Sequence, residues 1–252
     1  MNQTPNYLFI HKSLFFASHG ILVIGDLHLG YEEMLRNMGI LIPENQIKET
    51  IKEIENILTE IKKKKMKVEK IIFLGDSKHS FGYKWKEKNY FKEVYEFLKS
   101  KFKEENIILI KGNHDTIDYT YERKLKDFYI EGDIAFLHGH KQVNSIFNKE
   151  IKTVVMGHIH PSITLSDKHN IKRERYKCFL IGSYKKKEVI ILPSFLNIVE
   201  GTSLNEYQKE YKNSFSIIPK IRLLNFKIYI IGDKKTYEFG TVKQLMKNKF
   251  AE

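Results

Sequence analysis

The sequence has few of the features that mark a secreted or membrane-embedded protein. Cys178 is the only cysteine, which excludes an intramolecular disulfide and a metal cluster built on cysteines. The longest apolar runs, such as residues 189–192, are far too short to cross a bilayer. Residues 1–6 show no basic stretch leading into an apolar core, so we identify no signal peptide. These absences predict a cytoplasmic protein that makes no membrane contact.

Arginine is also scarce, although the chain is strongly basic. Only five of the 43 basic residues are arginine, and the 31 acidic residues leave a net charge of +12. Basic side chains that neutralise phosphates release counterions, so this charge favours a polyanion such as nucleic acid as a partner. A proteome rich in lysine and glutamate can give the same composition. Charge alone therefore leaves a nucleic-acid partner open.

The spacing of apolar residues predicts an α/β protein. We expect strands at residues 7–11, 14–16, 21–25, 71–75, 106–111, 134–137, 154–156, 176–181, 188–192, 222–231 and 237–239, and helices at 30–37, 44–65, 89–102 and 241–247. Strands and helices alternate in the first half, whereas the second half is mostly strands. This order predicts one domain over residues 1–252, with two sheets packed face to face and helices outside. The mostly β portion from about residue 202 remains unassigned.

Polar side chains follow five of the predicted strands. The five clusters are Asp26 with His28, then Asp76, then Asn113 with His114 and Asp115, then His138 with His140, and finally His158 with His160. Each cluster adjoins a glycine, and any one of them alone would be weak evidence. Because chemistry collects beyond the carboxyl ends of strands in an α/β sheet, we expect all five at one sheet edge.

The residue types in these clusters predict a metal site. Carboxylates, an amide oxygen and imidazoles suit Mn²⁺, Fe²⁺, Zn²⁺, Co²⁺ or Ni²⁺, and the absence of thiolates disfavours a structural zinc site. The donors are too many for one ion, which favours two ions that share a bridging carboxylate. Asp76 is the natural bridge because it stands alone on its loop.

The motifs Asp-x-His, Gly-Asp, Gly-Asn-His-Asp, His and Gly-His-x-His occur in this order between Asp26 and His160, and the set resembles the calcineurin-like metallophosphoesterases. The resemblance implies a four-layer α-β-β-α sandwich of two mixed sheets and a metal-dependent phosphoesterase. It also implies that one ion is held by Asp26, His28, Asp76 and His160, and the other by Asp76, Asn113, His138 and His158. A hydroxide bridging the ions would attack phosphorus. His114 would protonate the leaving oxygen or stabilise the phosphoryl oxygens, with Asp115 orienting it.

A narrower resemblance is carried by residues 28–36, 39–43, 75–79 and 191–195, which are similar to the ICC-like phosphoesterase branch. That branch includes proteins encoded beside DNA-repair ligases and helicases and suspected to be nucleases. The resemblance implies a nucleic-acid substrate, with DNA favoured, and a repair helicase or ligase as a partner. The expected cofactor is a pair of divalent ions, Mn²⁺ first, with iron, zinc, cobalt or nickel as alternatives.

Four side chains near the clusters are interpreted separately, two of them with an open alternative. His79 either contacts substrate phosphate or packs under the loop that follows Asp76. Arg36 either clamps a phosphate with both guanidinium nitrogens or lies exposed on a short helix. His140 is interpreted as a neighbour of the metal ligands rather than a ligand, and Lys78 is expected in solvent.

Three functions follow from these observations. The first is a dinuclear-metal phosphodiesterase that acts on nucleic acid, as a nuclease linked to DNA repair. The second is a phosphatase or phosphodiesterase for small nucleotides or phosphomonoesters, which would need a closed pocket instead of an open basic groove. The third is a non-catalytic scaffold that binds nucleic acid, which is disfavoured because every expected ligand is present.

Overall fold

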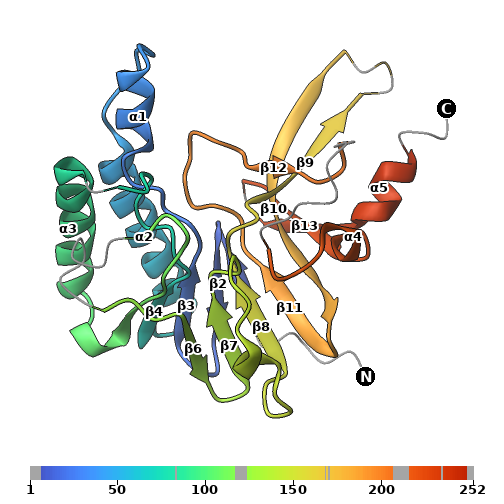
Figure 1. The fold of residues 1–252 in the computed structure, drawn as a ribbon, viewed down its shortest axis with the longest axis horizontal. Helices are drawn as coiled ribbons and strands as arrows, with labels where there is room; N and C mark the ends of the chain where they lie inside the picture. Colours follow the sequence, from blue (N-terminus) through green and yellow to red (C-terminus); the bar gives the residue numbers. More distant parts are fainter. Residues whose placement is uncertain are drawn as a thin grey trace. The chain divides into compact units, whose positions relative to one another are not determined.

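The computed structural model of the chain describes residues 7–82, 84–116, 124–167, 169, 171–206, 216–233 and 235–248, apart from the side chains of residues 247 and 248. The chain forms two compact units. Unit 1 comprises Met1–Asp127 and Phe195–Asn197, and unit 2 comprises Phe128–Ser194 and Ile198–Glu252. Each unit contains a mixed β-sheet with helices beside it (Figure 1), which confirms the predicted α/β class.

Unit 1 is built on a five-stranded sheet. Its strands are β1 (Leu8–Ile10), β2 (Ser13–Phe16), β3 (Ile21–Ile24), β4 (Lys70–Phe73) and β5 (Ile107–Leu109), and they lie in that order. β1, β2 and β3 pair antiparallel, whereas β3, β4 and β5 are parallel, with Ile24 opposite Phe73 and Phe73 opposite Leu109. The carboxyl ends of β3, β4 and β5 therefore lie level at one edge of this sheet.

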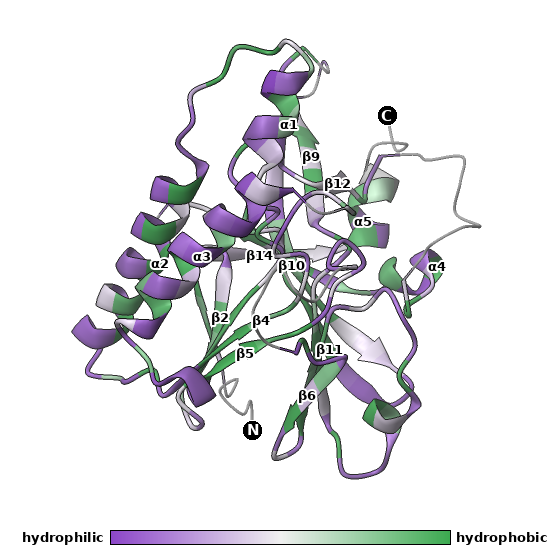
Figure 2. Ribbon diagram, turned by 60° about the vertical axis from the view of Figure 1, so that its left-hand side comes forward, coloured by the Kyte–Doolittle hydropathy of each residue, from purple (hydrophilic) through white to green (hydrophobic). Residues whose placement is uncertain are grey.

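Two helices, α2 (Gln46–Lys63) and α3 (Trp85–Lys99), share a core with this sheet. A short helix, α1 (Tyr31–Asn37), follows the turn after β3, and a short 3-10 helix, η1 (Glu104–Asn106), precedes β5. Apolar residues at three- and four-residue spacing, such as Ile54, Ile57 and Ile61, pack in one core with residues from β3, β4 and β5. α2 and α3 lie side by side, and each alternates apolar and polar bands (Figure 2). α3 begins four residues earlier than predicted, because its first turn has three charged residues and an exposed Trp85 and therefore lacks a buried apolar stripe.

Unit 2 contains a nine-stranded sheet. Its strands are β6 (Phe128–Glu131), β7 (Ile134–Leu137), β8 (Thr153–Met156), β9 (Pro161–Ser166), β10 (Arg173–Tyr184), β11 (Lys187–Ile191), β12 (Thr202–Ser203), β13 (Lys227–Ile231) and β14 (Thr236–Thr241). Seven of them follow the order β12-β9-β10-β11-β8-β7-β6, and β13 joins by pairing with β10 and β14. β7 and β8 are parallel, with Leu137 opposite Met156, so their carboxyl ends are level.

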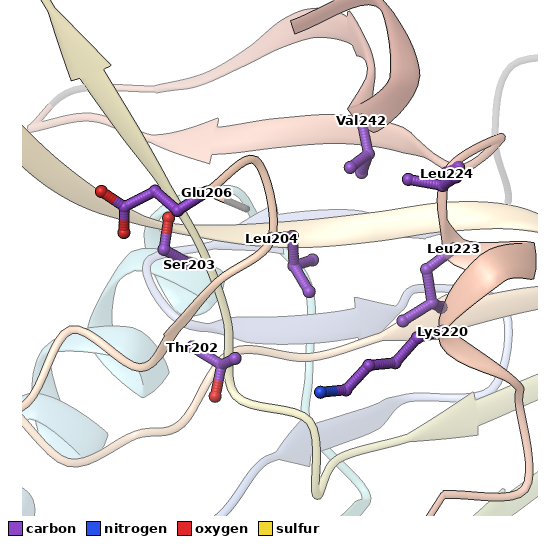
Figure 3. Close-up of a pocket in the computed structure, with 8 residues that line it drawn as sticks. All are labelled: Thr202, Ser203, Leu204, Glu206, Lys220, Leu223, Leu224 and Val242. Carbon is purple, nitrogen blue, oxygen red and sulfur yellow. The ribbon is translucent and has the colours of Figure 1, made fainter. Parts of the chain in front are cut away.

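The portion after residue 202 completes the core of unit 2. β13 pairs antiparallel with β10, with Ile230 opposite Cys178. The short helices η3 (Asn144–Phe147), α4 (Lys220–Leu223) and α5 (Val242–Asn248) lie outside the strands, and Ile146, Leu223 and Val242 are buried in the same core. A cavity of about 20 Å³, between β12, α4 and the start of α5 (Figure 3), has room for about one water molecule.

The sequence prediction was wrong about parts of unit 2. It missed β6, β9 and β12, and it began the strand at 222–231 too early, because residues 220–223 form α4 after Pro219. β10 begins at Arg173, before the predicted start, because its exposed polar residues pair with β9. None of the described helices is long and apolar enough to span a membrane.

Candidate metal centre

The first cluster lies on the turn that leaves β3. Asp26 is fully buried, and its main-chain oxygen accepts a hydrogen bond from the N–H of Phe195 at 2.9 Å. His28 has a left-handed backbone, with φ of 46°. The Gln46 side chain, from the first turn of α2, holds this turn by donating to the His28 carbonyl at 2.8 Å and accepting from the Gly30 N–H at 3.0 Å. Hydrogen bonds with the Phe195 main chain and the Gln46 side chain thus hold the turn after β3 in place.

Asp76, the predicted bridge, leaves β4 with the same left-handed backbone, at φ of 47°. Its Oδ1 accepts the main-chain N–H of His114 at 2.8 Å. Its Oδ2 lies 3.9 Å from Nε2 of His28 and 3.9 Å from Nε2 of His114. Gly112 packs against it so closely that a Cβ there would lie 2.0 Å from Oδ1. One buried carboxylate therefore stands between two imidazoles in unit 1.

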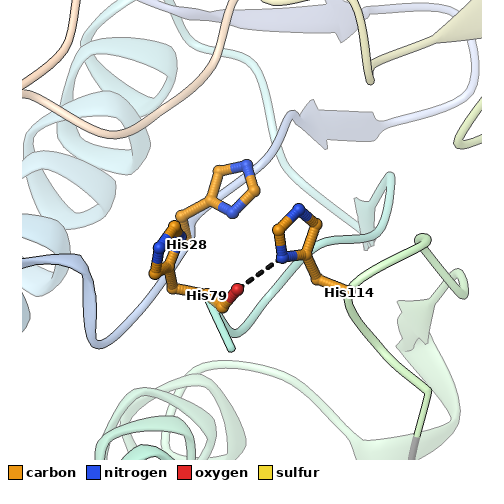
Figure 4. Close-up of side chains that lie close together, drawn as sticks. All are labelled: His28, His79 and His114. Carbon is orange, nitrogen blue, oxygen red and sulfur yellow. Dashed lines mark hydrogen bonds between the residues drawn. The ribbon is translucent and has the colours of Figure 1, made fainter. Parts of the chain in front are cut away.

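His28, His79 and His114 lie close together (Figure 4), with one ring nitrogen of each within 4.8 Å of the others. Nδ1 of His114 is hydrogen-bonded to the main-chain oxygen of His79. A carbonyl oxygen only accepts, so Nδ1 carries a hydrogen and the neutral ring has its lone pair at Nε2. His114 can therefore donate a proton from Nε2 only in its doubly protonated form.

His79 is neutral under ordinary conditions. Burial, and secondarily the charge of His114, lowers the pKa of His79 to about 4. Its Nε2 lies 3.2 Å from the sulfur of Met34, and its ring meets that of Tyr31 edge-on at 4.8 Å. These contacts pack His79 against α1, and its ring also stacks on that of His114. Its role toward a substrate stays a prediction.

Lys78 is buried, contrary to the expectation that it lies in solvent. Its side chain is only 1% exposed, and burial lowers its pKa, against the charges of Asp115, Glu87 and Asp76. Nζ donates to the main-chain oxygens of Ser80, of Gly82 at 3.3 Å and of His114 at 2.7 Å. The buried Lys78 side chain thus links the loop after β4 to the loop after β5 through these hydrogen bonds.

Two further carboxylates support these loops. Asp115 is fully buried and accepts the Gly112 N–H at 2.9 Å, which closes the turn that carries Asn113 and His114. Glu87 of α3 is 1% exposed and accepts from the N–H of Ser80 at 3.1 Å and from its hydroxyl at 2.6 Å. Asn113 is half-buried on the same turn.

In unit 2 the histidines follow two parallel strands. His138, 1% exposed, comes directly after β7, and its main-chain oxygen accepts the Gly157 N–H at 3.1 Å. Nδ1 of His158 lies 3.1 Å from Nε2 of His138. His140 lies beside this pair, with its ring 5.1 Å from that of His138. The five clusters are therefore divided between two sheets, three in unit 1 and two in unit 2, whereas one edge was predicted.

A left-handed backbone recurs among the predicted ligands. Eight non-glycine residues of the described chain have positive φ, and four of them are Asp76 and His28 with His158 and His160. Such a conformation costs about 1–3 kcal/mol unless glycine adopts it, and it persists where the side chain is needed in that place. Gly201 meets His160 so closely that a Cβ would lie 2.2 Å from the His160 oxygen. Half of the described non-glycine residues with this backbone are therefore predicted metal ligands.

The donor set fits divalent metal. Two nitrogens bound to one ion at about 2.1 Å lie roughly 3.0–3.4 Å apart for octahedral or tetrahedral angles. The 3.1 Å between the ring nitrogens of His138 and His158 falls in this range. The buried Asp76 carboxylate, placed between two imidazoles, supplies the oxygen ligand that such ions accept beside nitrogen.

The second predicted substrate contact, Arg36, lies near the end of α1. Its guanidinium pairs with Glu44 at 3.0 Å, and its side chain is 25% exposed. Sequence reasoning missed Gln46, Glu87 and the buried state of Lys78. Gln46 and Glu87 lie in the polar first turns of α2 and α3, where they read as ordinary exposed residues.

Comparisons with known proteins identify the family of the chain. The profile of calcineurin-like phosphoesterases matches residues 19–197. The nuclease MPE from Pseudomonas putida has a similar fold, with a TM-score of 0.59 and 18% sequence identity over 93% of this chain and 100% of that chain. A conserved uncharacterized protein from Streptococcus pneumoniae TIGR4, a predicted phosphoesterase, gives a TM-score of 0.35 and 14% identity over 87% of this chain and 95% of that chain. No curated protein matches significantly.

The matched residues 19–197 run from just before β3 to the segment Phe195–Asn197 and include every predicted metal ligand. They exclude the portion that forms β12, β13 and β14. The chain therefore belongs to the calcineurin-like phosphoesterase family and is a metal-dependent hydrolase of phosphate esters, as the order of its motifs predicted.

Proposed function

We propose that the protein is a dinuclear-metal phosphodiesterase that cleaves nucleic acid, with DNA as the favoured substrate and DNA repair as its setting. The observation that supports the metal assignment is the left-handed backbone of Asp76, His28, His158 and His160, four proposed ligands that adopt it beyond strand ends at a cost in stability. The nuclease identity of the Pseudomonas putida protein, whose fold is similar, supports the choice of substrate.

The distribution of charge supports a nucleic-acid substrate. The sequence of unit 2 has 21 basic and 12 acidic residues, a net charge of +9, which leaves +3 for unit 1. A lysine-rich surface attracts phosphates by releasing their counterions and speeds encounter with a polyanion. An excess of this size on one unit favours a polyanionic substrate over a small nucleotide.

The ligands proposed for the two ions are Asp26, His28, Asp76 and His160 for one, and Asp76, Asn113, His138 and His158 for the other. When bound, the ions would lower the pKa of water toward neutrality and neutralise charge on the phosphate. The chain supplies His114, whose Nδ1 is engaged by the His79 carbonyl, so that Nε2 is the atom that exchanges a proton with the leaving oxygen.

The metal assignment is tested by Mn²⁺-dependent hydrolysis of bis-p-nitrophenyl phosphate. Asp76→Asn and His158→Ala are expected to abolish the activity while the protein stays folded. Asp127→Asn and His19→Ala, which change exposed residues, serve as matched controls and should keep wild-type activity. Activity retained in Asp76→Asn or His158→Ala would contradict the two-metal assignment.

The role of His114 is tested separately. His114→Ala should lower kcat while the Mn²⁺ content after dialysis stays near the wild-type value. Loss of metal from this variant would make His114 a ligand instead. The substrate is tested by a screen of single-stranded DNA, duplex DNA, RNA, cyclic nucleotides and phosphomonoesters, where cleavage of small nucleotides alone would overturn the choice of nucleic acid.

A further inference from the structure

Phe81 is an exposed aromatic residue in direct contact with the predicted proton donor. Its ring stacks on the imidazole of His114 with ring centres 4.1 Å apart and an angle of 24° between the planes. Phe81 is nevertheless 58% exposed. A parallel stack covers one face of the phenyl ring, so the exposed area belongs mainly to the opposite face and the edge.

The loop that carries Phe81 is held rigidly on both sides. The buried Lys78 side chain binds the main-chain oxygens of Ser80 and Gly82, the residues directly before and after it. Glu87 binds the N–H and hydroxyl of Ser80. Thr116 donates its hydroxyl to the main-chain oxygen of Phe81 itself.

This support is unusual for a residue that buries so little of its own surface. Two ionisable side chains, Lys78 and Glu87, are each only 1% exposed, and desolvating them is costly. Their hydrogen bonds fix the position of an apolar ring in solvent, beside the group that faces the leaving oxygen. A ring that is pre-positioned in this way loses little entropy when a ligand stacks on it.

We propose that the outer face of Phe81 is a stacking platform for the base of the leaving nucleoside, which extends the stack formed by His114 and Phe81. The inference rests on the proposed phosphodiesterase function and names a structural element of its substrate. Stacking of a base on an aromatic side chain is tolerant of sequence and contributes about 1–3 kcal/mol per base. Phe81 would then favour nucleic acid over phosphate esters that lack a base.

The test uses three dinucleoside monophosphates: one with both bases, one whose leaving nucleoside lacks its base, and one whose retained nucleoside lacks its base. Analysis of the products identifies the leaving side. With Mn²⁺, the wild type should show a KM about tenfold lower when the leaving base is present, with little change in kcat. Phe81→Ala and Phe81→Leu should abolish this difference, whereas Phe81→Trp should keep it. Phe239→Ala removes another exposed ring, 40% exposed on β14, and should leave it unchanged.

A second measurement does not depend on hydrolysis. Binding of a dinucleotide that carries 2-aminopurine to the metal-free protein should quench its fluorescence through stacking, and Phe81→Ala should weaken that binding about tenfold. Equal loss of kcat on all three substrates in Phe81→Ala would mean that the ring only positions His114, and it would overturn the inference. So would a leaving-base effect that survives Phe81→Ala.

The outcomes also separate the inference from the function on which it rests. A wild-type protein that hydrolyses bis-p-nitrophenyl phosphate but does not distinguish substrates by their leaving base would refute the platform and leave the phosphodiesterase intact. A protein inactive on every phosphodiester would refute the proposed function, and the fluorescence measurement would then decide the base-binding claim by itself.

Discussion

Gly112→Ala tests whether the Asp76 carboxylate must stay where the structure places it. A Cβ at residue 112 would lie 2.0 Å from Oδ1 of Asp76 and 2.3 Å from its main-chain nitrogen, whereas ordinary contact begins at 3.4 Å. The carboxylate must therefore move by about 1.4 Å. Metal–ligand distances tolerate about 0.2 Å. The substitution changes no charge and removes no ligand, yet it should prevent Asp76 from holding metal.

The expected magnitude follows from two contributions. Overpacking of this kind costs about 1–3 kcal/mol of unfolding free energy, and each kcal/mol lowers Tm by about 2–4 °C in a chain of this size. Mn²⁺ at a hundred times its Kd should add about 2.7 kcal/mol to the wild type, which raises Tm by roughly 5–11 °C. The variant should start from a lower Tm and show almost none of this increase.

The assay is thermal unfolding with and without Mn²⁺, combined with metal analysis after dialysis and hydrolysis of bis-p-nitrophenyl phosphate. Gly82→Ala is the matched control, because no atom lies within 4 Å of a Cβ built there. It should behave as the wild type does in all three measurements. Normal metal content and activity in Gly112→Ala would refute the reasoning, since the clash would then be relieved without moving the ligand.

Three further predictions concern buried groups outside the ligand set. Burial raises the pKa of the Cys178 thiol, so a disulfide reagent at pH 8 should label it only after unfolding, and rapid labelling of the native protein would contradict this. Lys78→Met leaves three main-chain oxygens without their donor and should lower the unfolding free energy in urea by about 1–3 kcal/mol. Lys12 contacts Glu53 at 2.8 Å, and a double-mutant cycle with Lys12→Met and Glu53→Gln should give a coupling of at least about 0.5 kcal/mol in unfolding free energy. Additive effects of the two substitutions would contradict a stabilising contact between these residues.

The strands and helices of unit 1 were predictable because their signals are local. The apolar run before Asp26 and the spacing of Ile54, Ile57 and Ile61 each depend on neighbours in the sequence, and both elements lie within a few residues of their predicted positions. The family was predictable for a different reason. The order of several short motifs carries more information than any one of them, and the profile match confirms it.

The rest of the site depends on contacts that sequence spacing does not reveal. Lys78 is buried because three main-chain oxygens from two separate loops accept hydrogen bonds from it. No neighbouring residue in the sequence indicates these contacts. The left-handed backbone of Asp76 and His28 is equally invisible, because residues other than glycine rarely adopt it. The partition of the five clusters between two sheets was missed because strand pairing is not local.

The segment Phe195–Asn197 affects how the two units of the protein could be expressed as separate fragments. It belongs to unit 1, although it lies far along the chain, between two stretches of unit 2. The 7% exposed Lys12 binds the Phe195 oxygen at 2.7 Å and also contacts Asn197. A recombinant fragment ending at residue 127 would lack the segment Phe195–Asn197, and with it the Phe195 N–H that donates a hydrogen bond to the Asp26 oxygen. Expressing either unit by itself would therefore require splicing the gene, and a simple truncation should yield a fragment whose ligand turn lacks that support.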